Sequence, residues 1–123
     1  MVPRLLSART IEGTTVENAE GKDIGEIKDI MIDLETGYVA YAVLSFGGFL
    51  GFGEKLFAIP LEAFQFNTIE DEEKLILDID KERLENAPGF DKDHWPQNPD
   101  RTFISSVYTH YGYEPYWSKH EQV

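Results

Sequence analysis

The stretch from Ile24 to Phe46, IGEIKDIMIDLETGYVAYAVLSF, decides the fold class because its two halves are typical of the strands of one hairpin. The turn between them is LETG, residues 34–37, in which Gly37 supplies the conformational freedom that a tight turn needs. In the second half, YVAYAVLSF, apolar residues occupy both faces of the expected strand. Such a strand is usually central in its sheet and covered on both sides.

The first strand of this hairpin contains a break in its alternation. Ile30, Ile32 and Leu34 fall on one face of a two-residue period, but Ile27 is out of phase with them. A regular strand cannot place all four side chains on the same side. We therefore predict a bulge or a sharp coil within residues 26–29.

Short β-rich segments lie on either side of the hairpin, with turn residues between them. They are TTVE (14–17), KLFAIP (55–60), FQFN (64–67) and KLILDI (74–79). About six short strands without long helical crossovers predict a mainly β fold, either a small antiparallel β-barrel or a tightly coiled sheet.

Short helices are expected at three places. SARTIEG (7–13) has Ser7 as N-cap and Gly13 as stop, and KERLENA (81–87) follows the possible cap Asp80. RTFISSVYTHY (101–111) repeats apolar residues every four positions, at Phe103, Val107 and Tyr111, and ends at Gly112.

The chain divides into a barrel domain and an extension. Residues 1–87 contain the predicted strands, whereas GFDKDHWPQNP (89–99) has no period and is expected to be an extended connector. The aromatic end of the chain, YEPYW (113–117), is unusual for a polar tail. We expect the extension, residues 88–123, to pack on the barrel or on a partner subunit, because buried rings contribute strongly to stability.

Composition and charge exclude several function classes. The chain of 123 residues has a net charge of −12 and contains no cysteine. Thiol chemistry is therefore absent, and direct nucleic-acid binding is disfavoured because it depends on Lys and Arg. No signal peptide and no apolar run of membrane-spanning length is present, which predicts a cytoplasmic protein without a membrane span.

The glycine-rich segment GGFLGFGEK, residues 47–55, does not have the spacing of a phosphate-binding loop, and it connects strand to strand. We expect a wide hairpin in which Phe49, Leu50 and Phe52 fold back over an open barrel end. Alternatively, these three side chains form an exposed apolar contact for a partner or a second subunit.

No constellation of residues predicts an active site, a cofactor site or a metal site. Asp91 and Asp93 resemble the beginning of a calcium loop, but the later ligands of that loop are missing. Asp29 and Asp33 share one strand parity and could act together, although solvent-facing structural carboxylates are far commoner.

The order of these features resembles the PRC-barrel domain, a small β-barrel also found in the reaction-centre H subunit and in a ribosome maturation factor. The resemblance rests on GKDIGEIKDIMIDLETGYVAYAVLSFGGFLGFGEKLFAIPLEAF, residues 21–64, and the later ENAPGFDKDHWP is similar to the continuation in stand-alone bacterial members. It implies a non-enzymatic adaptor that binds proteins or self-associates, with no catalytic residues to carry over.

We therefore expect a homodimeric protein-interaction module. Its candidate contact residues are Phe49, Leu50 and Phe52 in the glycine-rich segment, and Tyr116 and Trp117 in the tail. One alternative is a ribosome-assembly accessory that acts through a basic protein partner. The other is an uncharacterised enzyme or ion-binding domain that uses Asp29 and Asp33 or the region around Asp91.

Overall fold

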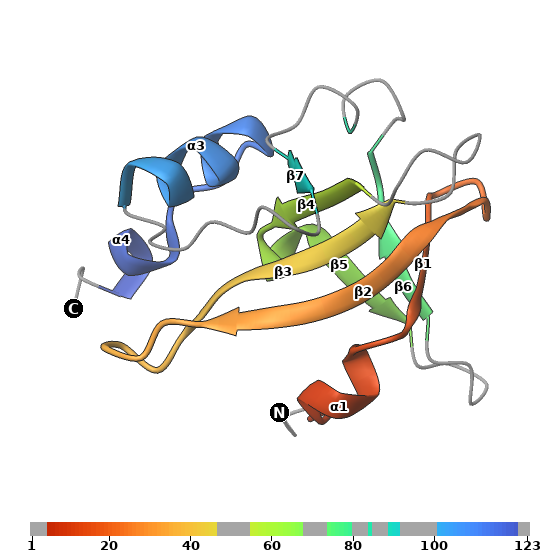
Figure 1. Ribbon diagram of the computed structural model, residues 1–123, viewed down its shortest axis with the longest axis horizontal. Helices are drawn as coiled ribbons and strands as arrows, with labels where there is room; N and C mark the ends of the chain where they lie inside the picture. The colour runs from red at the N-terminus through yellow and green to blue at the C-terminus, as the bar shows by residue number, and fades with distance from the viewer. Residues whose placement is uncertain are drawn as a thin grey trace.

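The computed structural model describes residues 5–46, 55–67, 74–79, 84, 89–91 and 101–120. These residues form one seven-stranded sheet in the order β5-β6-β1-β2-β3-β4-β7 (Figure 1). The strands are β1 (Thr15–Glu17), β2 (Asp23–Ile32), β3 (Val39–Phe46), β4 (Lys55–Ile59), β5 (Phe64–Asn67), β6 (Lys74–Leu77) and β7 (Gly89–Asp91). The predicted mainly β architecture with short helices is confirmed.

The helices are short, and the α-helices with described bounds lie near the two ends of the chain. They are α1 (Ala8–Ile11), the 3-10 turn η2 (Leu61–Ala63), α3 (Arg101–His110) and α4 (Tyr116–His120). The predicted cap of the first helix is confirmed, because the Ser7 hydroxyl accepts a 3.0 Å hydrogen bond from the Thr10 N–H. Gly13 has a φ of 85°, which ends that helix in the left-handed region where glycine is favoured.

The strand β3 is central, as its two apolar faces predict. It pairs with β2 on one side and β4 on the other, and its residues 40–45 are all buried. The largest fully buried side chains come from five strands, from the residue after β4, from Leu84 and from helix α3: Tyr41, Phe57, Ile27, Leu44, Leu56, Ile59, Leu77, Leu84, Val16, Val43, Val107 and Pro60. One continuous core therefore joins the sheet to the C-terminal helices.

The sheet has to curl because of a short connection. Strands β4 and β5 are five places apart in the sheet order, so a flat sheet would separate them by about 24 Å. Only residues 60–63 link them, and the chain from Ile59 to Phe64 can reach about 18 Å at most. The 3-10 turn shortens that reach further, and β5 and β6 consequently lie behind β2 and β3 in Figure 1.

One strand pair differs from the expected antiparallel pattern. Strands β1 and β6 are parallel, with Val16 opposite Leu75 and Glu17 opposite Ile76, whereas every other pair of the described sheet is antiparallel. Parallel neighbours need a long connection. Here β2 to β5 form that connection, and because these strands belong to the same sheet, no helical crossover marks the pair in the sequence.

The predicted bulge in β2 is confirmed. The register between β2 and β3 shifts between Ile27 and Asp29, leaving Lys28 as the extra residue and Ile27 fully buried. The shared face that we expected for Ile30, Ile32 and Leu34 is wrong for Leu34, because β2 ends at Ile32 and Leu34 belongs to the turn. A two-residue period cannot set the direction of a side chain outside the strand.

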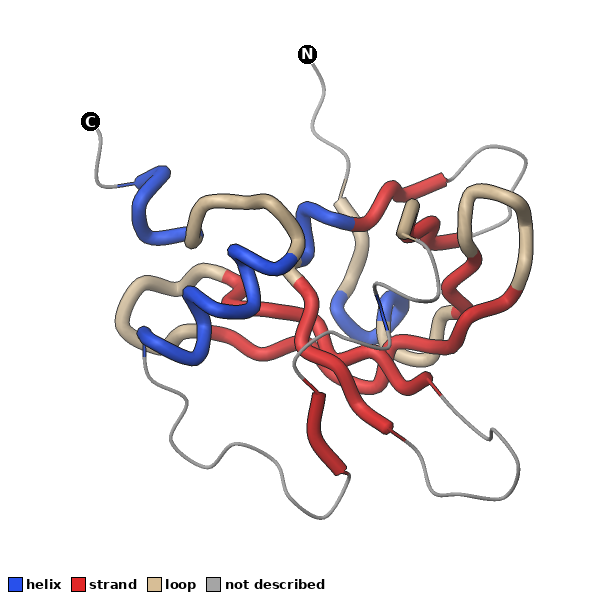
Figure 2. The backbone as a smooth tube through the Cα atoms, turned by 90° about the horizontal axis from the view of Figure 1, so that it is seen from above, coloured by secondary structure: helices blue, strands red, loops and turns tan. Residues whose placement is uncertain are grey.

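The C-terminal extension folds against its own sheet. Helix α3 begins at Arg101 and ends near Gly112, whose φ is 81°, as predicted. Its buried residues are Ile104, Val107 and Tyr108, and Tyr111 directly after the helix is also buried, whereas the spacing had suggested a face with Phe103 in place of Ile104 and Tyr108. Figure 2 shows this helix running beside the strands of the sheet.

The predicted connector contains a strand that sequence periodicity missed. Gly89–Asp91 forms β7 and pairs with β4, with Phe90 opposite Leu56. A three-residue strand is too short to show a period, and its position comes from the available edge of β4. Of the expected helix at 81–87, the structure describes only Leu84, which is helical and buried.

Candidate functional site

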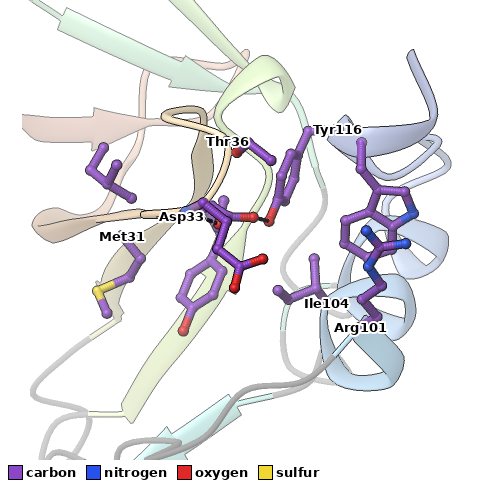
Figure 3. A pocket seen from close by; sticks show the side chains of 11 residues that line it. Met31, Asp33, Thr36, Arg101, Ile104 and Tyr116 are labelled. Carbon is purple, nitrogen blue, oxygen red and sulfur yellow. Dashed lines mark hydrogen bonds between the residues drawn. The ribbon is translucent and has the colours of Figure 1, made fainter. Parts of the chain in front are cut away.

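A pocket of about 350 Å³ lies between the β2–β3 hairpin and the two C-terminal helices. Figure 3 shows Met31, Asp33 and Thr36 on the hairpin side and Arg101, Ile104 and Tyr116 on the helical side. Its volume is at the small end of the range of roughly 300 to 1,000 Å³ that is usual for ligand pockets. The pocket therefore has room for a small group or for one or two side chains.

A second bulge in the hairpin shapes the floor of this pocket. Met31 is opposite Tyr41 and Ile32 is opposite Val39, so Ala40 is the extra residue on β3. A bulge of this kind changes the direction of neighbouring side chains, and here both Ala40 and Tyr41 line the pocket. The carbonyl oxygen of Ala40 accepts a 2.6 Å hydrogen bond from the Tyr108 hydroxyl, which fastens α3 to the bulge.

Asp33 connects the hairpin turn to the C-terminal helix α4. Its Oδ1 accepts a 2.9 Å hydrogen bond from the Glu35 N–H, the local pattern by which aspartate stabilises a turn. Its Oδ2 accepts a 2.6 Å hydrogen bond from the Tyr116 hydroxyl (Figure 3). A distance of 2.6 Å is typical of a hydroxyl bound to an ionised carboxylate.

This contact shifts the titration of both partners. The Tyr116 hydroxyl, together with the N–H of Glu35, holds the pKa of Asp33 below its usual value. Burial raises the pKa of Tyr116, and the hydrogen bond to Asp33 raises it further. Near pH 7, Asp33 is therefore an ionised acceptor and Tyr116 a neutral donor. Such a pair is suited to a structural hydrogen bond between the hairpin turn and α4.

The opposite wall of the pocket combines a cation with an aromatic ring. The guanidinium carbon of Arg101 lies 4.8 Å from the centre of the Trp117 ring, within the range of a cation–π contact. The Trp117 ring packs edge to face against Tyr116, with their centres 5.1 Å apart. The first residue of α3 and the first two residues of α4 thus form one connected wall.

Tyr41 adds an enclosed polar atom to the pocket wall. The residue is 1% exposed, and its hydroxyl has no hydrogen-bond partner among the described residues. Burial raises the pKa of Tyr41, so its hydroxyl stays neutral. The Tyr41 ring packs edge to face against the ring of Phe103, with the two ring centres 6.1 Å apart. Tyr41 is therefore held mainly by apolar packing.

Beside the pocket, the hairpin exposes large apolar side chains. Leu34 is 93% exposed at the turn, and Ile32 and Tyr38 on either side of it are 49% and 40% exposed. Isolated exposed apolar residues are common, but three within seven residues around one turn form a small apolar patch. We call Ile32, Leu34 and Tyr38 the hairpin patch.

Of the five predicted contact residues, the structure describes two. Tyr116 and Trp117 both line the pocket, but they pack on their own chain, and Tyr116 is only 8% exposed. Their role toward a partner stays a prediction. Phe49, Leu50 and Phe52 lie outside the described residues.

The predicted carboxylate pair is not brought together at the pocket. Asp33 lines it, whereas Asp29 is exposed and its Oδ1 accepts a 2.8 Å hydrogen bond from the neighbouring Ile30 N–H. The Asp91 side chain and Asp93 lie outside the described part of the chain. Within that part, no group of three or more His, Asp or Glu side chains is arranged to hold a metal ion.

Most of the residues that line the pocket were not singled out from the sequence as site residues, and three of them show why. Glu35, Tyr41 and Arg101 come from the turn, the central strand and the start of α3. The aromatic tail did predict that residues near Tyr116 would be packed. No local pattern indicates the Asp33 contact, because the two residues are 83 positions apart.

Comparison with known proteins agrees with the fold. The family model described as PRC-barrel domain matches residues 3–84, about two thirds of the chain. A search of curated proteins found no match. In the regions that the structure describes, no helix is both long and apolar enough to cross a membrane. The curled sheet and the matched segment together show that this chain belongs to the PRC-barrel domain family.

Proposed function

We propose that this PRC-barrel protein is a non-enzymatic, cytoplasmic protein-interaction module that self-associates as a homodimer. The observation that carries the proposal is the hairpin patch, in which Leu34 is 93% exposed beside a pocket of about 350 Å³. An apolar surface next to a concave one is typical of a contact between proteins.

The chemistry of the pocket supports binding over catalysis. A general base near neutral pH works best with a pKa close to the pH of the solution. The hydrogen bonds to Asp33 lower its pKa, and burial raises that of Tyr116, so both groups move away from that range. Their mutual contact also occupies the atoms that would have to reach a substrate.

The charge of the chain supports a protein partner over a nucleic acid. With a net charge of −12, the molecule repels a phosphate backbone. The same charge favours a basic protein as a further partner once the module has assembled. A role in ribosome assembly through such a protein is compatible with this charge.

Light scattering over a range of concentrations tests the proposal. We expect a species of twice the 14.1 kDa chain mass, dissociating on dilution. We also expect Phe49→Ser with Phe52→Ser to weaken the dimer without unfolding the chain, if the glycine-rich segment contributes to the contact. A particle that keeps the mass of one chain at every concentration would contradict self-association.

A further inference from the structure

We propose that the pocket between the β2–β3 hairpin and helices α3 and α4 binds an organic cation, namely an ammonium group on a short apolar stem. Free alkylamines carry such a group, and so does the end of a lysine side chain on a protein partner. The inference goes beyond the proposed self-association, because it assigns a ligand to the pocket of each single chain.

The first reason is the balance of charges in the pocket lining. In the part of the chain that the structure describes, this lining contains the carboxylates of Asp33 and Glu35 and one guanidinium, that of Arg101. The hydrogen bond from the Tyr116 hydroxyl is the largest cause of the lowered pKa of Asp33, so this carboxylate is ionised near pH 7. The lining is therefore net negative within a chain of net charge −12, and it attracts cations and repels anions.

The carboxylates and the guanidinium lie on different walls of the pocket. Asp33 and Glu35 belong to the hairpin turn, whereas Arg101 is the first residue of α3 on the helical side (Figure 3). Arg101 is already engaged within the chain, with its guanidinium carbon 4.8 Å from the centre of the Trp117 ring. The Glu35 side chain is exposed, and among the described residues no ion pair involves it. A bound cation can therefore contact Glu35 directly, while Asp33 attracts it through its charge.

The second reason is the aromatic and apolar part of the lining. Tyr41, Tyr116 and Trp117 line the pocket. The faces of aromatic rings attract organic cations, and the contact of Trp117 with a guanidinium of this chain shows that a cation is stable at this wall. Met31 and Ile104 add apolar surface, and a volume of about 350 Å³ accepts a linear alkyl stem.

The third reason is the buried hydroxyl of Tyr41. This residue is 1% exposed, and its hydroxyl has no hydrogen-bond partner among the described residues. An unsatisfied buried polar atom costs free energy. A hydroxyl oxygen accepts a hydrogen bond from an ammonium N–H, so a ligand that reaches this wall removes the cost.

The first experiment uses n-butylammonium as the probe and the indole N–H of Trp117 as the reporter. Two-dimensional NMR of the wild-type chain follows this signal during a titration at constant ionic strength, and Trp95→Phe identifies it, because the chain has two tryptophans. We expect a saturable shift. The neutral n-butanol and the anionic butyrate should bind at least about tenfold more weakly. Butyrate binding as tight as that of butylammonium would overturn the inference.

The second experiment compares two exposed carboxylates in the turns at the two ends of β2. Glu35→Gln removes the one that lines the pocket, and Glu20→Gln removes one in the turn before the strand. We expect Glu35→Gln to weaken butylammonium binding about threefold to tenfold, and Glu20→Gln to leave it unchanged. Equal affinities in the wild type and both variants would overturn the placement of the ammonium group at the hairpin turn.

Arg101→Gln tests the sign of the ligand charge. It removes a competing cation from the pocket and frees the Trp117 ring, so we expect butylammonium to bind more tightly. A site for anions would respond in the opposite way, because Arg101 would be its attracting group. Weaker butylammonium binding in Arg101→Gln, with unchanged circular dichroism, would therefore contradict the inference.

The third experiment separates the two sources of the ammonium group. Its probes are a blocked alanine peptide with one central lysine and the same peptide with norleucine at that position, which keeps the stem and removes the charge. Binding of the lysine peptide at least as tight as that of butylammonium, without binding of the norleucine peptide, would identify a lysine of a protein partner. Binding of butylammonium alone would identify a small amine.

The outcomes separate this inference from the proposed function. A chain that dimerises in light scattering but binds neither butylammonium nor the lysine peptide would overturn the cation site and leave self-association standing. A monomeric chain that binds butylammonium would overturn self-association and leave the cation site standing. Circular dichroism and thermal melting establish that each variant is folded before affinities are compared.

Discussion

Gly25 shows how a single residue limits the approach of two strands. Its φ is 148°, and a Cβ built on it would overlap the carbonyl oxygen of Ser45 on β3 and lie 3.1 Å from the carbonyl carbon. Only a residue without a side chain fits between these backbones. The glycine therefore permits the close pairing of β2 with β3 just before the first bulge.

We predict that Gly25→Ala lowers the free energy of unfolding by about 3 kcal/mol, since it adds steric overlap to a strained φ. Urea denaturation measures the change. Gly21→Ala is the matched control, because Gly21 also has a positive φ, of 83°, but its added Cβ would meet open space. Equal losses in the two variants would show that the contact with Ser45 has no effect.

The Asp33 carboxylate reports directly on the position of the tail. Its pKa is lowered first by the Tyr116 hydroxyl, so we predict that Tyr116→Phe raises the pKa of Asp33 toward 3.8. NMR titration of the carboxyl carbon measures this shift. Tyr113→Phe changes another tail tyrosine and should leave the titration of Asp33 as it is. An unchanged pKa in Tyr116→Phe would mean that the tail does not contact the turn in solution.

The lowered pKa also has a consequence for stability in acid. A carboxyl whose pKa is lower in the folded chain stabilises that chain above its unfolded value of 3.8, and the contribution disappears as pH falls through the folded pKa. When the pH is lowered below 3.8, we expect the melting temperature of Tyr116→Phe to fall less than that of the wild-type protein. Thermal melts of both proteins across that interval measure the difference.

At the scale of elements, the bulge in β3 and helix α3 depend on each other. Ala40 is the extra residue of the bulge, and the Tyr108 hydroxyl satisfies its carbonyl oxygen at 2.6 Å. Both residues are buried, at 5% and 3% exposure, so water cannot easily replace this bond. The helix therefore stabilises the irregular backbone that forms the pocket floor.

We predict that Tyr108→Phe destabilises the protein by about 1 to 3 kcal/mol, because it leaves the buried Ala40 carbonyl without this hydrogen bond. Chemical denaturation measures the loss. Thr109→Val removes a hydroxyl from an exposed position of the same helix and should change stability by less than about 0.5 kcal/mol. A Tyr108→Phe variant as stable as this control would be evidence against docking of α3 on the bulge.

At the scale of the whole molecule, three tyrosines make stability depend on alkaline pH. Burial is the first cause that raises the pKa of Tyr41, Tyr108 and Tyr116 above 10.0. A group with a raised pKa stabilises the folded chain below its unfolded pKa and loses that contribution as pH rises. The core that joins sheet and tail thus also sets the alkaline limit of the fold.

We predict that the free energy of unfolding falls as pH rises above 10.0, since the unfolded tyrosines ionise while the buried ones stay neutral. Denaturation at several alkaline pH values measures this slope. Tyr108→Phe should reduce the slope, whereas Tyr38→Phe, at a residue 40% exposed, should leave it unchanged. Equal slopes in all three proteins would show that buried tyrosines do not control the effect.

The amino-acid sequence by itself determined the segments of β1 to β6, the hairpin at LETG, the bulge near Ile27, the Ser7 cap and the end of α3 at Gly112. Each follows from periodicity, capping or turn chemistry, which act between residues a few positions apart. Only the tertiary structure decided the parallel pairing of β1 with β6, the bulge at Ala40, and the meeting of Asp33 with Tyr116. These depend on contacts between distant parts of the chain, and such contacts form only after the sheet has curled and the tail has packed on it.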